Sequence, residues 1–291
     1  MSIDLGGATR ERPLGILPVA GVLIGLALVA WVVTIERMDG MDAGPGTELG
    51  TLGWFLGLWV TMMAAMMFPA VAPMAAVVSR VSAGPAPGTS RAVGPTAIFI
   101  AGYLVVWTAF GVVAYAAYRA IDAADPGWLE WDAQGPLVAG AAIAAAGAYQ
   151  LTPLKRACLK HCRSPVAFVM HRWRNGAAGA FVMGVEHGAW CLGCCAGLML
   201  VLLVLGVMSL VWMALIAAAI FIEKVLPIGE RASRAFAVAL IGLGIWVAVA
   251  PGTVPFLGDP DMPMNMDESP AQGGMPGTMT PDSPPMDGAM P

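Results

Sequence analysis

Charged residues are scarce in this sequence, and their scarcity excludes an ordinary soluble domain. Asp, Glu, Lys and Arg make up 12% of the 291 residues, whereas hydrophobic residues make up 58%. A soluble globular domain carries about 25% charged residues. Between residues 179 and 222 the only formally charged side chain is that of Glu186. Because about 20 consecutive apolar residues suffice to cross a bilayer as a helix, the sequence predicts an all-α membrane protein.

The chain also lacks the signatures of several other classes. Its apolar runs are continuous, whereas the strands of a transmembrane barrel alternate. No phosphate-binding loop and no kinase-like motif occurs, so nothing indicates chemistry driven by ATP. The net charge of −4 offers no excess of positive charge for nucleic acid, which we exclude as a partner. No catalytic residues stand out, and although enzymatic activity stays open, the sequence favours a binding protein.

Hydropathy divides the chain into a bundle of seven predicted transmembrane helices over residues 14–256. A short segment, residues 1–13, precedes the bundle, and residues 257–291 follow it. The fifth and sixth helices form one apolar run, which we divide at Gly206–Ser209 because the sequence has a weak turn signal there. The predicted helices are residues 14–34, 50–77, 94–118, 134–152, 179–205, 208–226 and 235–256.

The distribution of positive charge predicts the orientation of the bundle. Of the 15 Lys and Arg residues, only Arg37 and Arg119 fall in segments on the predicted outer side. Cytoplasmic loops carry an excess of Lys and Arg, so we predict a cytoplasmic N-terminus and a C-terminus outside. The first apolar run is too long for a secretory signal and has no small-residue cleavage site after it. We therefore expect a multi-pass protein of the bacterial cytoplasmic (inner) membrane, surrounded by the lipid bilayer.

The predicted helix at residues 179–205 carries a stripe of metal-binding side chains. At 100° per residue, Met183, His187, Cys191 and Cys194 fall within an arc of about 80°. Polar and ionisable groups inside a membrane are costly and usually functional. We interpret His187, Cys191 and Cys194 as metal ligands and Met183 as a secondary one.

Two further side chains of this helix lie off the stripe. Cys195 lies just beside it and fits a packing role, since free cysteine behaves as a small apolar residue. Glu186 points about a quarter turn away. We expect Glu186 to pair with a basic group such as Lys224 or to pass protons during metal release.

Four methionines lie close together in the predicted helix at residues 50–77. Counting about 1.5 Å per residue from opposite membrane faces puts them at a depth that overlaps the stripe. The alternative is that methionine fills the core as a flexible apolar side chain. We predict Met63 and Met66 as ligands and Met62 and Met67 as secondary candidates.

The predicted inner loop before residue 179 contains further sulfur and imidazole groups. Cys158, His161 and Cys162 lie among basic side chains. In a helical loop, Cys158 and Cys162 would share a face, and the basic neighbours would favour the metal-binding thiolate. We predict that Cys158 and Cys162 exchange metal on the inner side, with His161 as a secondary ligand. The alternative is two incidental thiols in a loop that touches lipid.

The segment after residue 257 has a different composition. Residues 258–291 contain no Lys, Arg, Leu, Ile, Val or aromatic residue, so they cannot bury a core and are predicted to be disordered. Methionine is their main apolar residue, and thioethers are soft ligands suited to Cu(I). We predict that this tail captures metal outside the cell membrane through Met262, Met264, Met266, Met275 and Met279.

Four motifs in order resemble the DUF2182 family of predicted metal-binding integral membrane proteins. The motifs lie at residues 59–69, 158–165, 188–195 and 223–224, and the resemblance covers roughly residues 50–230. Ala196 and Ser209 depart from the family pattern, so neither position is expected to supply a ligand. The resemblance implies membrane location and metal association, without an established reaction.

The thioethers favour Cu(I) as the bound metal, because zinc accepts Cys and His but rarely Met. We predict a protein that transports copper or delivers it to a copper-dependent membrane or periplasmic protein. Two alternatives stay open. One is a membrane thiol-disulfide oxidoreductase that uses Cys191 and Cys194, and the other is a structural subunit of a membrane complex.

Overall fold

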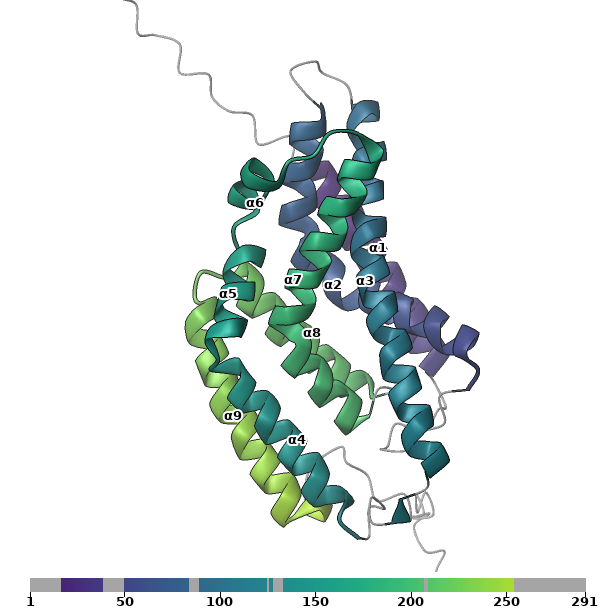
Figure 1. Ribbon diagram of the computed structural model, residues 1–291, viewed down its shortest axis with the longest axis vertical. Coiled ribbons are helices and arrows are strands. Elements are labelled where there is room, and N and C mark those ends of the chain that lie inside the picture. Colours follow the sequence, from purple (N-terminus) through teal and green to yellow (C-terminus); the bar gives the residue numbers. More distant parts are fainter. Residues whose placement is uncertain are drawn as a thin grey trace, which may run out of the picture. The chain divides into compact units, whose positions relative to one another are not determined.

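The structure is a computed structural model, and it describes residues 17–38, 50–83, 89–124, 126–127, 133–206 and 209–253. These residues form helices and connecting turns and contain no strand, which confirms the all-α prediction (Figure 1). The helices are α1 (Leu17–Met38), α2 (Leu52–Ala83), α3 (Thr89–Ala124), α4 (Gly135–Gln150), α5 (Pro153–Cys162), α6 (Pro165–Arg172), α7 (Gly176–Leu205), α8 (Leu210–Val225) and α9 (Gly229–Val249), followed by the 3-10 turn η3 (Pro251–Thr253).

The chain divides into two units, residues 1–258 and residues 259–291. All of the described residues belong to the first unit. The predicted N-terminal segment and the tail methionines, Met262 to Met279, lie outside the described residues.

Five of the described helices, α1, α2, α3, α7 and α9, are long and apolar enough to cross a membrane. Helices α4 and α5 meet at a 64° bend and could together form a sixth crossing. These helices support a membrane protein, but their lengths do not confirm seven spans. The reason is that α4 and α8 have 16 residues each. Sixteen residues make about 24 Å of helix, shorter than the hydrocarbon core of about 30 Å.

The long apolar run is divided where the sequence predicted. Helix α7 ends at Leu205, and Gly206 has a φ of 112°, a conformation that favours glycine. Helix α8 begins at Leu210, and the Ser209 hydroxyl accepts a hydrogen bond from the Trp212 amide at 3.5 Å. This N-cap satisfies an amide that the first turn of a helix leaves free.

The segment predicted as an inner loop instead lies alongside α7. It forms α5, which together with α4 packs antiparallel to α7, and α6, which packs on α2 and α5. Cys162 of α5 contacts Cys194, their sulfurs 3.6 Å apart, and the Phe168 ring of α6 lies 5.5 Å from the His187 ring. Later residues of the segment therefore meet earlier residues of α7. The sequence analysis considered a helical form of this segment, and Pro153–Cys162 is helical. Its docking on another helix could not be read from its own sequence.

Glycines allow the closest helix contacts, as small residues do in membrane bundles. A Cβ at Gly184 of α7 would overlap the carbonyl oxygen of Phe99 in α3. In the same way, a Cβ at Gly140 of α4 would overlap the carbonyl oxygen of Gly244 in α9. These two contacts hold the backbones of α3 and α7, and of α4 and α9, at short range.

We expect Gly184→Ala to lower the free energy of unfolding by about 1–3 kcal/mol, because the new methyl group meets backbone that cannot move aside alone. Gly242→Ala in α9 is the matched control, since a Cβ there has no neighbour within 4 Å. It should be neutral or slightly stabilising, because alanine favours the helix by up to about 1 kcal/mol. Thermal unfolding in detergent measures both. Equal stability of the two variants would contradict the close contact of α3 and α7.

Candidate metal centre

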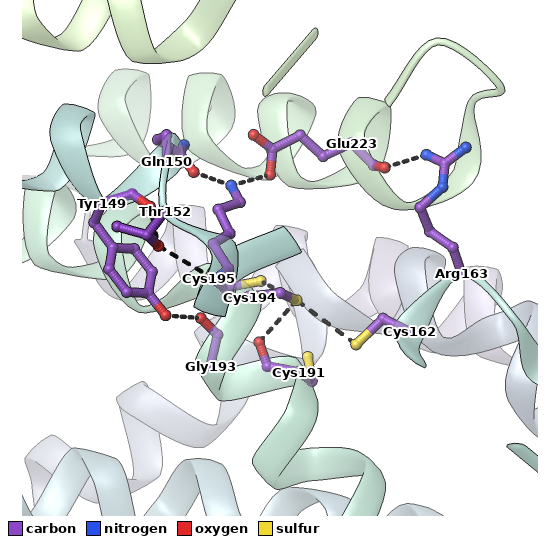
Figure 2. A network of polar contacts seen from close by, with 11 residues as sticks. Tyr149, Gln150, Thr152, Cys162, Arg163, Cys191, Gly193, Cys194, Cys195 and Glu223 are labelled. Carbon is purple, nitrogen blue, oxygen red and sulfur yellow. Dashed lines mark hydrogen bonds and ion pairs between the residues drawn. The ribbon is translucent and has the colours of Figure 1, made fainter. Parts of the chain in front are cut away.

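Cys194 lies at the centre of a cluster of thiols, of which Cys194 and Cys195 are buried and Cys162 is partly buried. Its sulfur is 3.6 Å from the sulfur of Cys162 on α5 and 3.6 Å from that of Cys195 (Figure 2). Two sulfurs that share one tetrahedral ion at about 2.3 Å lie about 3.8 Å apart. Each of these two contacts therefore has nearly the spacing of sulfurs that share a metal ion. We call Cys162, Cys194 and Cys195 the thiol cluster.

The thiols meet in pairs and do not converge on a single point. In the part of the chain that the structure describes, no group of three or more His, Cys, Asp or Glu side chains is arranged to hold a metal ion. A pair of soft sulfurs matches the ligand preference of Cu(I). The arrangement thus has the donor chemistry of a copper site without the geometry of a closed zinc site.

The Cys191 sulfur contacts two polar side chains that the sequence analysis did not identify as its neighbours. The ammonium of Lys224 donates a hydrogen bond to its sulfur at 2.8 Å, and the Tyr103 hydroxyl is hydrogen-bonded to it at 3.0 Å. The Cys194 thiol donates instead to the carbonyl oxygen of Cys191 at 3.1 Å. This hydrogen bond runs to the backbone of Cys191, and the use of Cys191 and Cys194 as a redox pair stays a prediction.

Glu186 pairs with basic groups, as predicted, but these are arginines and not Lys224. Glu186 forms ion pairs with Arg174 at 3.1 Å and Arg172 at 3.8 Å, both close to the start of α7. Lys224 lies beside Cys191, five residues further along α7. Five residues correspond to about 7.5 Å along the helix axis, so one ammonium group does not serve both side chains.

His187 and Met183 continue the stripe toward the start of α7. His187 is 3% exposed and lies among the rings of Phe99, Tyr103 and Phe168, with centroids 5.5 to 5.9 Å from its own. Its Nδ1 has no hydrogen-bond partner. Met183 is also buried, and its sulfur accepts a hydrogen bond from the Arg174 amide at 3.4 Å. Both side chains are enclosed, as the stripe predicted.

The methionines of α2, Met62, Met63, Met66 and Met67, are all buried in the core that also contains Cys191 and Cys194. Helix α2 runs antiparallel to α3, since Trp59 donates a hydrogen bond to the Trp107 carbonyl and Phe55 contacts Tyr115. Continuing this register by one turn brings Met63 to the level of Tyr103, the neighbour of Cys191. This alignment of α2 with α3 agrees with the prediction that the methionines lie at the same depth as the stripe of α7. Ligation by Met63 and Met66 stays a prediction.

Cys158 and His161 lie apart from the thiol cluster. The Cys158 sulfur packs on Gly193, where a Cβ would be 2.8 Å from it. That basic neighbours favour its thiolate stays a prediction. His161 stacks on Trp190, with ring centroids 4.2 Å apart.

A buried ion pair fixes α5 beside the thiol cluster. The Lys155 ammonium lies 2.6 Å from the Glu223 carboxylate, and both side chains are at most 2% exposed. Lys155 also donates to Gln150, and the Arg163 guanidinium donates to the Glu223 carbonyl oxygen (Figure 2). A carboxylate within an apolar run, such as that of Glu223, indicates from the sequence that the group has a partner or a function. Its partner could not be inferred, because Lys155 is 68 residues away.

Comparison with known proteins agrees with this donor chemistry. A family described as PpoB2, copper chaperone, matches residues 56–247, well over half of the chain. No curated protein and no solved structure matches. The family match supports copper handling, although not the DUF2182 name. The matched residues include the thiol cluster, Cys191 and the buried ion pair, and the chain belongs to the PpoB2 family of copper chaperones.

Proposed function

We propose that this protein binds Cu(I) at the thiol cluster and delivers it to a copper-dependent membrane or periplasmic protein. The observation that carries the proposal is the position of the Cys194 sulfur, 3.6 Å from two other sulfurs in a buried part of the bundle. Thiolates are the ligands that Cu(I) prefers. Cys191 and His187, at the same face of α7, are the further ligands, with Met63 and Met66 from α2.

The proposed setting is the bacterial cytoplasmic membrane, with seven crossings, the N-terminus inside and the C-terminus outside. The break between α4 and α5 supports a crossing made of short helices. Interrupted helices occur in membranes where they surround an ion site, because the freed backbone groups must find partners there. The tail methionines would capture copper on the outer side. Zinc stays a candidate cargo, since it too accepts Cys and His.

Thiol-disulfide exchange is a second candidate, favoured by the contact between the sulfurs of Cys162 and Cys194. It stands beside Cys191 and Cys194, the pair predicted from the sequence, as a pair of sulfurs that would form such a disulfide. Thiol trapping in cells separates the two functions. A redox enzyme shows a disulfide that forms and disappears during turnover, whereas a copper chaperone shows thiols that copper protects from alkylation.

The test is the copper content of the purified, reduced full-length protein after expression with added copper. We expect bound copper, measured by elemental analysis, and its transfer to a copper-free acceptor protein. A chain that ends at residue 257 should bind fewer copper ions but keep the tightest site, because the cluster lies in the remaining part.

Well-folded protein without copper would exclude the proposed function. The same copper stoichiometry with and without residues 258–291 would show that the tail methionines are not ligands, and would leave the site in the bundle standing.

A further inference from the structure

We propose that a pocket at the start of α7, on the cytoplasmic side in the proposed orientation, is the portal through which Cu(I) from the cytoplasm reaches the thiols, and that Met183 and His187 bind the ion on the way. This inference rests on the proposed function. It assigns a path to the start of α7, makes Met183 a transient ligand, and gives His187 a role in transfer in addition to the ligation proposed above.

The pocket lies between the end of α2 and the starts of α3 and α7, and has a volume of about 300 Å³. Met183 forms part of its wall, and the Arg174 amide holds the thioether sulfur in place at 3.4 Å. Arg174, half exposed, also borders the pocket. A soft sulfur donor is thus placed where the interior of the bundle meets its surface. The lining includes Val78, Ser82, Pro95, Trp173, Arg174 and Met183.

The charges at the rim do not bar a cation. The guanidinium groups of Arg174 and Arg172 lie 3.1 Å and 3.8 Å from the Glu186 carboxylate. One carboxylate serves both guanidinium groups and offsets one of their two positive charges, which reduces the repulsion that they exert on Cu(I). Glu186 acts here on the charge near the pocket and is not a ligand.

His187 is the next donor after Met183. Four residues separate the two, so His187 follows on the same face, about 6 Å further along the helix. Its Nδ1 is buried and has no partner, although a buried polar atom without a partner is costly. The three surrounding aromatic rings exclude water. A passing soft cation would supply the missing partner.

Further equal steps lead from His187 to the thiols. Cys191 follows after four residues and Cys194 after three more, so each step covers about 4.5 to 6 Å. Transfer from Met183 to His187 forms a copper–nitrogen bond as the copper–sulfur bond breaks. Both ligands are neutral, so the ion stays Cu(I) and this step neither takes up nor releases a proton.

Blocking the pocket tests the path by the rate of loading. Ala180 lines the pocket, so Ala180→Trp should fill it. With Cu(I) supplied as its bicinchoninate complex to the reduced full-length protein, we expect loading at least about 10-fold slower and the same final copper content. Met183→Leu keeps the volume and removes the sulfur, and should slow loading likewise. The control is Val182→Trp in the same helix, since the Val182 side chain is 37% exposed. This variant should take up Cu(I) at the normal rate.

Normal loading rates in both Ala180→Trp and Met183→Leu would overturn the portal. If Ala180→Trp fails to fold, as judged by gel filtration, the rate of Met183→Leu decides alone. A wild-type protein that takes up no Cu(I) would instead exclude the proposed function, so the two failures are distinguishable.

Discussion

Cys194→Ser is expected to weaken Cu(I) binding on the order of 1,000-fold, which corresponds to about 4 kcal/mol. The Cys194 sulfur contacts both Cys162 and Cys195, so its loss removes both sulfur pairs at once. A serine hydroxyl is a hard donor and cannot replace a thiolate for Cu(I). Competition with bicinchoninate on the full-length protein measures the affinity.

Cys158→Ser is the matched control, because the Cys158 sulfur packs on Gly193 and takes part in neither of the two sulfur contacts of Cys194. It should keep nearly normal affinity. Tight binding by Cys194→Ser, or an equal loss in Cys158→Ser, would contradict the central position of Cys194.

Cys162→Ser and Cys195→Ala divide the cluster further. From the helical stripe alone, Cys195→Ala was expected to be mild, but its sulfur lies as close to Cys194 as that of Cys162 does. The variant with the larger loss of Cu(I) affinity identifies which sulfur binds the ion together with that of Cys194.

Lys155→Met is expected to lower the free energy of unfolding by about 3–5 kcal/mol, since removing one partner of a buried ion pair leaves the other charge unpaired. Lys155 and Glu223 are both fully enclosed, and their 2.6 Å contact joins α5 to α8. Unfolding in detergent, followed by circular dichroism against temperature or denaturant, measures the loss.

The double variant Lys155→Met with Glu223→Leu is the control for this experiment. Replacing both charges by apolar side chains is often nearly neutral, so most of the lost stability should return. Equal stability of Lys155→Met and the wild type would show that the ion pair contributes little. A double variant as unstable as the single one would show that Glu223 has another essential role.

The helices themselves followed from the sequence, because they depend on local properties. Continuous apolar runs predicted α1, α2, α3, α7 and α9. The division at Gly206 followed from a glycine whose φ of 112° other residues rarely adopt. The stripe of Met183, His187 and Cys191 followed from the period of one helix, and all three side chains are buried. The donor types, soft sulfur and imidazole, were also enough to indicate copper.

Contacts between helices required the tertiary structure, since spacing along one helix says nothing about what crosses it. Only the docking of α5 along α7 brings Cys162 to Cys194. The packing of α8 on α7 brings Lys224 to Cys191, and the end of α6 and the turn before α7 bring two arginines to Glu186. Lys155 and Glu223 meet across 68 residues. Sequence periodicity determined which side chains share a face, and helix packing decided which faces meet.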